Sequence, residues 1–412
     1  MADRKNLDLD FVRAQFPALD QGWAYFENAG GSLVARPVIE RLAEFASKTR
    51  VQPGYPYAPS ARAEEILAEN ERLMAAMINA DPEEVLIGPS TTMNVYVLSH
   101  ALAPLFSPGD EVIVTNLDHE ANNGAWRRLA QHEITVKEWQ INPGTADLEI
   151  ETLESLLSER TRLVCVTQCS NVVGSINDIA AITKRVHNAG AWICADAVSY
   201  APHRRLDVKA LDVDFYLFSL YKVYGPHLAI LYGKRERLLE ARSQNHYFFA
   251  ENDIPGKFKL GGHQFEASGA LGGLIEYFDA LYAHHFKAPE DDLHTRLGKV
   301  FELIAKHEQT LATRFLDFVG AKQEIRLIGR NTPDSTARAP TFSFSVEGKA
   351  SASIPPALVD AKVGLNSGDF YGLRCVEALG YDASDGVVRA SMVHYNSEDD
   401  VDRLIAALDG AI

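Results

Sequence analysis

The sequence predicts a large α/β domain built on a mainly parallel sheet, followed by a smaller α/β domain. The chain has 412 residues, a length that suits one large and one smaller core rather than a single one. Between about residues 85 and 235, apolar runs typical of strands alternate with helical patterns. Runs such as LVCV (163–166) and WICA (192–195) are continuously apolar, and strands of that kind lie in parallel sheets buried on both faces.

The expected strands and helices of the large domain follow one another in a regular order. A helix is predicted over Ile179–Ala189, where apolar residues recur at intervals of three and four. The predicted strands are Val85–Gly88, Glu111–Thr115, Ile134–Trp139, Arg162–Thr167, Ala191–Ala195, Phe215–Phe218 and Leu228–Leu231. This alternation predicts a doubly wound domain, which we assign to residues 20–285.

The remainder of the chain has a different pattern. A long helix is predicted over Asp291–Phe318, before strands at Ile325–Leu327, Thr341–Val346 and Val387–His394 and a last helix at Ser397–Ala411. We assign residues 286–412, together with 1–19, to a smaller C-terminal domain.

The amino-acid composition argues against some classes of binding partner. The formal net charge of −16 disfavours binding to nucleic acid or to anionic membranes. No apolar run approaches the roughly 18–20 residues that span a bilayer. The N-terminal residues, MADRKN, lack the apolar core of a secretory signal, and we therefore expect a cytoplasmic protein.

The four cysteines, Cys165, Cys169, Cys194 and Cys375, form no CxxC pair, which argues against a zinc or redox motif. Cys165 and Cys194 lie in apolar runs and are expected to be small core residues. Cys169 and Cys375 lie near the motifs described below and remain candidates for a catalytic role.

Two charged residues follow strands of the predicted sheet, at the edge where such sheets bind ligands. Asp196 ends the run ICAD, and Lys222 follows the strand that ends at Phe218. Each has an ordinary explanation, an ion-paired or capping aspartate and a solvated lysine. Together they also fit a pyridine cofactor with an aldehyde, because a lysine forms an imine with the aldehyde and a carboxylate keeps the ring nitrogen protonated.

Further polar residues follow other strands of the same sheet. Thr91 and Thr92 open a helix, where hydroxyls cap and free N–H groups can bind a phosphate. Ser219 and Tyr221 offer more hydroxyls beside Lys222.

His119 and Asn171 come after two more strands. His119 either caps a helix or stacks on a pyridine ring, and Asn171 either makes a turn or donates to the ring oxygen. The order of all these sites along one sheet edge favours a shared role.

Taken together, the motifs resemble the class V aminotransferase family, and within it the cysteine-desulfurase-like proteins. The resemblance covers nearly the whole chain and depends on these segments: YFENAGGS (25–32), DPEEVLIGPSTT (81–92), DHEANN (118–123), SNVVGSINDI (170–179), DAVSYAPH (196–203), DFYLFSLYKVYGP (214–226) and VVRASMVHYNSEDDVDRL (387–404). It implies the fold-type-I architecture, pyridoxal 5′-phosphate (PLP) as cofactor, and a homodimer with shared active sites.

The resemblance also implies roles for individual residues. Lys222 corresponds to the Schiff-base lysine, Asp196 to the partner of the pyridinium nitrogen and His119 to the ring-stacking histidine. Arg389 corresponds to the arginine that holds the substrate carboxylate, a task that suits its planar fork. The other implied cofactor-binding residues are Thr91, Thr92, Asn171, Ser199, Ser219, Tyr221 and Gly262, and the other implied substrate-binding residues are Asn28 and Tyr371.

Three positions depart from the family pattern. Ser199 stands where many relatives have glutamine or histidine, and Gly262 where they often have a phosphate-binding threonine. Tyr371 takes the place of the sulfur-accepting cysteine of one desulfurase branch, and Cys375 follows four residues later, in an expected helix.

The sequence therefore predicts a PLP enzyme that acts on an α-amino acid. A C–S lyase that works by β-elimination is favoured, because the loop lacks the desulfurase cysteine. A class V aminotransferase or an amino-acid epimerase stays open, since the shape of the pocket decides which bond breaks. A non-catalytic α/β binding protein is the remote alternative, and no phosphate-loop or dinucleotide motif supports it.

Overall fold

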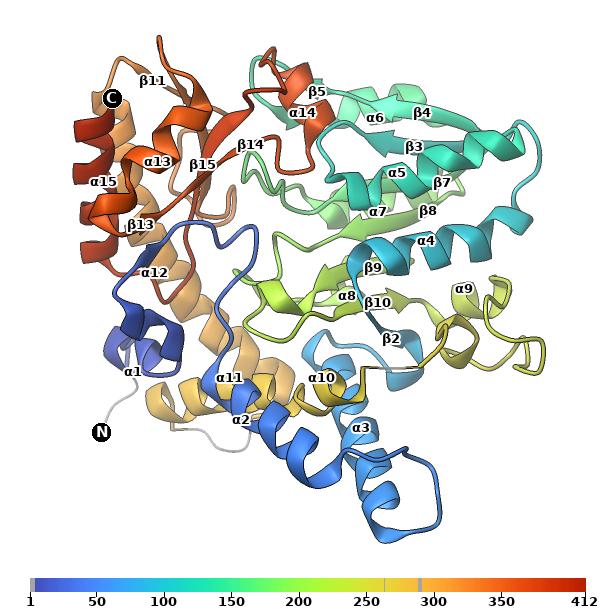
Figure 1. The fold of residues 1–412 in the computed structure, drawn as a ribbon. Helices are drawn as coiled ribbons and strands as arrows, with labels where there is room; N and C mark the ends of the chain where they lie inside the picture. Colours follow the sequence, from blue (N-terminus) through green and yellow to red (C-terminus); the bar gives the residue numbers. More distant parts are fainter. Residues whose placement is uncertain (1–3, 263, 288–290) are drawn as a thin grey trace.

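A seven-stranded sheet forms the centre of the protein in a computed structural model that describes residues 4–262, 264–287 and 291–412 (Figure 1). The strand order is β2-β10-β9-β8-β7-β3-β4. These strands are β2 (Val85–Gly88), β3 (Glu111–Thr115), β4 (Thr135–Trp139), β7 (Thr161–Thr167), β8 (Trp192–Asp196), β9 (Phe215–Ser219) and β10 (Ala229–Gly233). Strand β10 runs antiparallel to both of its neighbours, and the other neighbouring strands are parallel. The predicted mainly parallel sheet is confirmed.

Successive strand residues face opposite sides of the sheet and build two separate cores. On one side, Val164 and Ile193 pack with apolar residues of α3 (Ala58–Met77), α7 (Ile179–Asn188) and α11 (Gly272–His285). On the other, Leu163 and Leu217 pack with residues of α4 (Thr91–Leu102) and α5 (Gly124–Arg127). Covering both faces with helices explains why the strands are apolar without alternation.

The helices have the following bounds. They are α1 (Leu9–Arg13), α2 (Arg36–Glu44), α3 (Ala58–Met77), α4 (Thr91–Leu102), α5 (Gly124–Arg127), α6 (Ile150–Leu156), α7 (Ile179–Asn188), α8 (Val208–Leu211), α9 (Arg235–Glu240), α10 (Phe265–Gly269), α11 (Gly272–His285), α12 (Leu293–Ala321), α13 (Ile354–Ala357), α14 (Leu373–Ala378) and α15 (Glu398–Ala411). Within the described ranges, no helix is both long and apolar enough to cross a membrane.

The C-terminal part contains an antiparallel sheet of order β11-β12-β15-β14. Its strands are β11 (Ile325–Leu327), β12 (Thr341–Val346), β14 (Asn366–Gly368) and β15 (Val387–Ser391). Apolar residues of this sheet pack against α12 and α15, for example Phe342 against Phe315. The strand expected over 387–394 ends at Ser391. The residues after it contact the N-terminal segment, where the Tyr395 hydroxyl accepts from the Leu33 N–H and Asn396 donates to the Tyr25 carbonyl oxygen.

The N-terminal segment joins the C-terminal part. Strand β1 (Ala24–Tyr25) pairs in parallel with β13 (Val363–Gly364), and Ala24 and Phe26 lie in the C-terminal core. Strands β5 (Ile141–Asn142) and β6 (Asp147–Leu148) form a further small antiparallel pair. The pairing brings residues 25–33 to the edge of the large sheet that the candidate site occupies.

Candidate functional site

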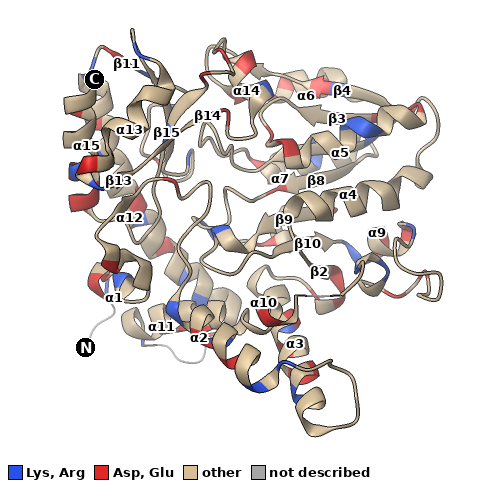
Figure 2. Ribbon diagram, viewed as in Figure 1, with Lys and Arg blue, Asp and Glu red and all other residues tan. Residues whose placement is uncertain are grey.

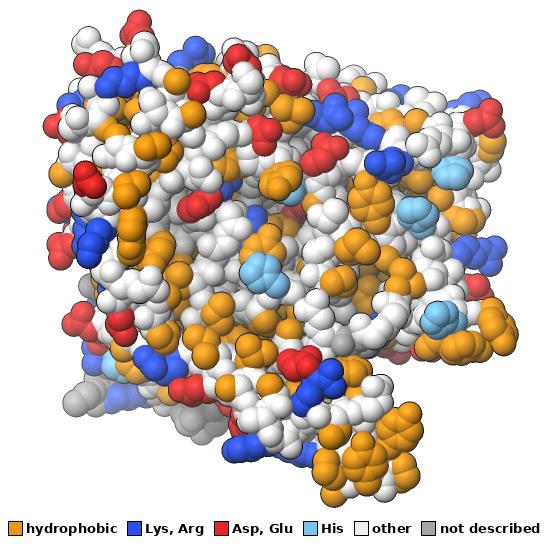
Figure 3. Space-filling view, viewed as in Figure 1, with side chains coloured by type: hydrophobic (Ala, Val, Ile, Leu, Met, Phe, Trp, Pro, Cys, Tyr) orange, Lys and Arg blue, Asp and Glu red, His pale blue; other side chains and the backbone are white. Residues whose placement is uncertain are grey.

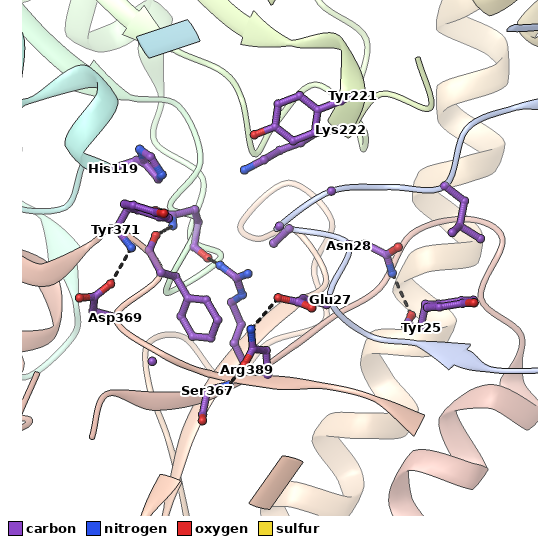
Figure 4. Close-up of a pocket in the computed structure, with 18 of the residues that line it drawn as sticks. Tyr25, Glu27, Asn28, His119, Tyr221, Lys222, Ser367, Asp369, Tyr371 and Arg389 are labelled. Carbon is purple, nitrogen blue, oxygen red and sulfur yellow. Dashed lines mark hydrogen bonds between the residues drawn. The ribbon is translucent and has the colours of Figure 1, made fainter. Parts of the chain in front are cut away.

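The residues singled out after the strands come together at one edge of the large sheet. They line two cavities that share four side chains, those of His119, Asn171, Tyr221 and Lys222. The larger cavity, of about 790 Å³, opens between the large sheet and the C-terminal part, and the smaller lies deeper, over β8 and β9. In Figure 4, Lys222 points into the larger cavity, His119 and Tyr371 lie together on another side, and Arg389 rises from its strand.

Asp196 and Lys222 are both buried at the ends of neighbouring strands, and yet they do not pair with each other. Asp196 is the last residue of β8, and its Oδ1 accepts a hydrogen bond of 2.8 Å from the Val198 N–H. Lys222 ends the short turn after β9, and no hydrogen bond or ion pair joins its Nζ to another residue within the described part of the chain. Two buried opposite charges that stay apart leave room for a group between them.

Burial shifts the pKa values of both groups toward neutrality. It lowers the pKa of Lys222 to about 8, with a further lowering by Arg389, while the charge of Asp196 opposes this change. Burial raises the pKa of Asp196 to about 6, while Val198 N–H and Lys222 oppose the rise. About a tenth of Lys222 is therefore a free amine at pH 7, and the free amine is the form that attacks a carbonyl.

One end of the smaller cavity is built to accept an anion. Ser90 caps α4 by accepting from the Met93 N–H, and this leaves the backbone N–H groups of Thr91 and Thr92 at the helix N-terminus. Thr91 Oγ1 and Ser219 Oγ are 2.7 Å apart, and both line the cavity together with Ser199. Helix N-termini with free N–H groups and hydroxyls attract phosphate. The sequence placed Thr91, Thr92, Ser199 and Ser219 in one site, and the structure brings them together.

Gly262 is separate from this group. It lines neither cavity, and a Cβ placed on it would meet no atom within 4 Å. Its expected cofactor contact is thus not made within this chain.

His119 presents a neutral ring to the site. Its Nδ1 accepts a hydrogen bond of 3.0 Å from the Ala121 N–H, so the ring proton lies on Nε2. Burial, together with the charges of Lys222 and Arg389, lowers the pKa of His119 to about 3. A flat neutral imidazole can stack on an aromatic ring, whereas it is too weak a base to hold a proton at neutral pH.

Arg389 is a buried cation with unused hydrogen-bonding capacity. It lies on β15, its Nη1 donates to the Asn171 carbonyl oxygen over 3.0 Å, and its guanidinium stacks 3.6 Å from the centre of the Phe370 ring. Its Nε is buried and has no hydrogen-bond partner among the residues that the structure describes. Burial lowers the pKa of Arg389 to about 10, which leaves it charged at neutral pH. A buried cation with a free donor is a binding site for a carboxylate.

The loop that carries Tyr371 is fixed by hydrogen bonds to the large domain. The Asn171 side chain donates to the Phe370 carbonyl oxygen over 2.8 Å, and the Glu120 N–H donates to the Tyr371 carbonyl oxygen over 2.8 Å. Phe370 and Tyr371 both have positive φ angles, 54° and 59°, a strained conformation that the surroundings must hold in place. The Tyr371 side chain is 73% exposed, and its ring centre lies 5.3 Å from that of His119.

Asn28 lines the larger cavity, although its side chain is used within the protein. Its Nδ2 donates to the carbonyl oxygens of Tyr25 and Ser391, and its Oδ1 accepts from the Tyr395 hydroxyl. The sequence indicated that Asn28 binds the substrate. In the structure, its amide forms hydrogen bonds that hold the cavity wall together.

The four cysteines are buried. Cys375 lies in α14 with no exposed surface, and burial raises the pKa of its thiol to about 12. Cys169 lines the smaller cavity, and burial raises the pKa of its thiol to about 12 as well. Because the thiolate is the nucleophile, both thiols are poorly suited to attack at neutral pH.

Sequence reasoning did not single out Asp118 and Glu27. The buried carboxylate of Asp118 accepts from the Thr167 N–H and from the Asn122 amide, and so ties the segment that carries His119 to β7. It is an acid three residues after the end of β3, a weaker form of the signal that marked Asp196. Glu27 lines the larger cavity near Arg389 and accepts a hydrogen bond from the Asn366 amide. It lies in an irregular loop, where no periodic sequence pattern indicates a functional residue.

Comparison with known proteins agrees with this geometry. The family model described as aminotransferase class-V matches residues 24–305 and 297–404. The chain is 38% identical over 412 residues to the aminotransferase-like protein FGM3 of Gibberella zeae, with 98% of each chain covered. It is 34% identical over 416 residues to the cysteine desulfurase-like protein ustD of Aspergillus flavus, with 98% of this chain and 90% of that one covered.

A solved structure gives the same result. The cysteine desulfurase CsdA of Escherichia coli superposes with a TM-score of 0.83 at 25% identity, covering 98% of both chains. The resemblance predicted from the motifs and the predicted fold are both confirmed.

Proposed function

The chain belongs to the class V aminotransferase family, whose members are PLP-dependent enzymes, and we propose that it binds PLP at Lys222 and cleaves amino acids by β-elimination. The observation that carries the proposal is the unpaired set of buried charges. Asp196, Lys222 and Arg389 surround the joined cavities without forming ion pairs with one another. Such burial is costly unless a ligand completes the site.

The residues present fit this cofactor. Asp196 would pair with the pyridine nitrogen, His119 would cover one ring face, and the start of α4 with Ser219 would hold the phosphate. When bound, PLP supplies an electron sink that stabilises negative charge at the α-carbon of the substrate. Arg389 then holds the substrate carboxylate, and the free amine of Lys222 takes the α-proton.

β-Elimination is favoured over persulfide formation because the chain offers no accessible thiol to accept sulfur. The desulfurase position holds Tyr371, whose phenol cannot form a persulfide, on a loop fixed at Phe370 and Tyr371. Cys375 and Cys169 are buried with raised thiol pKa values. With cysteine as substrate, elimination consumes water and releases pyruvate, ammonia and hydrogen sulfide.

The test assays cysteine with the unaltered protein and with Cys375→Ala and Cys169→Ala, alone and together. We expect sulfide, pyruvate and ammonia in equal amounts from all four proteins. Alanine formation that disappears with either cysteine, together with a trapped persulfide on that residue, would contradict the proposal. Screening other amino acids for keto acids or for inverted stereochemistry distinguishes transamination and epimerisation.

The proposal includes a homodimer. Tyr247 and Phe248 are 99% and 68% exposed, and Tyr55 and Tyr57 are exposed on the segment that projects between α2 and α3. Figure 3 shows hydrophobic side chains gathered at the end of this projection. Exposed aromatic clusters of this kind typically mark protein interfaces. In the homodimer that the family resemblance implies, Gly262 would approach the partner's phosphate site.

Light scattering tests the homodimer. We expect a dimer for the unaltered protein and a monomer for the double variant Tyr247→Ser, Phe248→Ser. A monomeric unaltered protein would contradict this part of the proposal.

The surface charge favours a small-molecule substrate over a nucleic acid as the binding partner. In the view of Figure 2, Lys and Arg are interspersed with Asp and Glu along the helices and loops. With a net charge of −16, such a surface repels polyanions. The proposed substrate is accordingly a small amino acid that enters the larger cavity.

A further inference from the structure

His394 occupies a buried position between the large domain and the C-terminal part. It follows β15 by three residues, five residues after Arg389. Its Nε2 hydrogen-bonds the hydroxyl of Tyr277 on α11, and its Nδ1 lies 3.0 Å from the hydroxyl of Tyr224. The Tyr224 hydroxyl in turn lies 2.8 Å from the Pro202 carbonyl oxygen. Four groups thus form a continuous chain of hydrogen bonds.

The direction of each hydrogen bond in this chain is determined. The Pro202 carbonyl oxygen only accepts, so the Tyr224 hydroxyl donates to it. The Tyr224 oxygen must then accept from Nδ1–H of His394. Burial holds the pKa of His394 well below its ordinary value, so the imidazole is neutral and its unprotonated Nε2 accepts from the Tyr277 hydroxyl. One protonation pattern therefore satisfies the whole chain.

These hydrogen bonds connect the segments that carry the proposed catalytic residues. Tyr224 lies two residues after Lys222 and has a positive φ of 66°, which makes the turn sharp. Pro202 belongs to the segment that follows Asp196. His394 follows the strand of Arg389. Phe16 packs against the rings of Tyr224, Tyr277 and His394, at 5.7, 5.3 and 5.9 Å, and keeps water away from them. Hydrogen bonds sealed in this way are strong and specific.

We propose that His394 is a positioning residue, which fixes the Lys222 turn relative to the strand that carries Arg389. It acts through the Nδ1–H bond to Tyr224 and touches neither cavity. The inference rests on the proposed function, in which Lys222 binds PLP. If the bond is lost, Lys222 is held less firmly between Asp196 and Arg389, and PLP binds more weakly.

The test compares His394→Asn with His394→Leu. The two replacements have nearly the same shape, but the asparagine amide nitrogen takes the place of Nδ1 and still donates to Tyr224. Titration of cofactor-stripped protein with PLP, followed by absorbance, measures the affinity. We expect His394→Leu to bind PLP about tenfold more weakly than His394→Asn, the effect of one buried hydrogen bond.

A double-mutant cycle then locates the effect. Added to the His394→Asn variant, Tyr224→Phe should weaken PLP binding about tenfold. Added to the His394→Leu variant it should have a much smaller effect, because that variant already lacks the hydrogen bond. Tyr395→Phe is the matched control. Its hydroxyl is equally buried in the adjacent position but bonds Asn28 and the Leu33 N–H rather than the Lys222 turn. It should lower the melting temperature and leave PLP affinity within about twofold.

Each outcome decides the matter. Equal PLP affinity of His394→Asn and His394→Leu would overturn the inference, as would affinity that follows melting temperature across all variants, Tyr395→Phe included. Should His394→Leu not fold, the comparison of Tyr224→Phe with Tyr395→Phe decides by the same measurement. An unaltered protein that binds no PLP would overturn the proposed function and this inference with it.

Discussion

The amine of Lys222 should react with PLP at an unusually low pH. Burial, assisted by the charge of Arg389, lowers the pKa of Lys222 from the ordinary 10.5 to about 8. At pH 7, about one molecule in ten then has a free amine, against about one in 3,000 for an ordinary lysine, which favours attack by roughly 300-fold. Because the free amine is the reactive form, the rate of PLP attachment depends on the fraction deprotonated.

Stopped-flow absorbance with cofactor-stripped protein measures this rate between pH 6 and 10. We expect the rate to rise about tenfold per pH unit below pH 8 and to level off above it. Lys222→Ala serves as the control and should show no attachment phase. A rate that continues to rise up to pH 10 would refute the reasoning, because it would show that Lys222 titrates as an ordinary lysine.

Two substitutions should move the midpoint in opposite directions. Arg389→Met removes a neighbouring positive charge and should raise the midpoint, whereas Asp196→Asn removes a negative charge and should lower it. Each rate is compared with the plateau of the same variant, so that weaker PLP binding does not distort the midpoint. Shifts in the same direction would show that the charges of Arg389 and Asp196 do not control Lys222.

Three further predictions concern the proposed roles. Borohydride reduction of the PLP-loaded protein should attach the cofactor to Lys222, and peptide mapping that finds another lysine would contradict the assignment. Arg389→Ala should weaken amino-acid binding by about 10- to 150-fold, the loss of a charge-assisted hydrogen bond of roughly 1.5–3 kcal/mol. Spectral titration measures it, and unchanged affinity in a folded, PLP-loaded variant would make Arg389 structural. Asp196→Ala should lower kcat far more than amino-acid affinity, and equal loss of both would indicate a structural carboxylate instead.

Strand positions in the large domain could be predicted closely because burial on both faces demands apolar runs. Val85–Gly88 and Glu111–Thr115 form the strands β2 and β3 with the expected bounds. The short strand β14, with the sequence NSG, gave no such signal. It pairs with β15 through backbone atoms alone, and side-chain patterns do not report backbone pairing.

The candidate site divides in the same way. Residues that follow strands, such as Asp196, Lys222 and Thr91, could be predicted because parallel strands end at one edge of a sheet. Asn28 lines the larger cavity, but two of the hydrogen bonds that occupy its amide come from residues more than 360 positions away. No local pattern could show that its side chain is already used.

The sequence by itself determined the fold class, the family and the residue types gathered at the sheet edge, because these follow from local periodicity and from motifs that lie within single segments. Only the tertiary structure decided which charges remain unpaired, which thiols are buried and how the His394 chain links the Lys222 turn to the Arg389 strand. These properties depend on distances between segments far apart in the chain. A pKa or a hydrogen bond is fixed by neighbours in space, and packing of the two parts of the molecule supplies those neighbours.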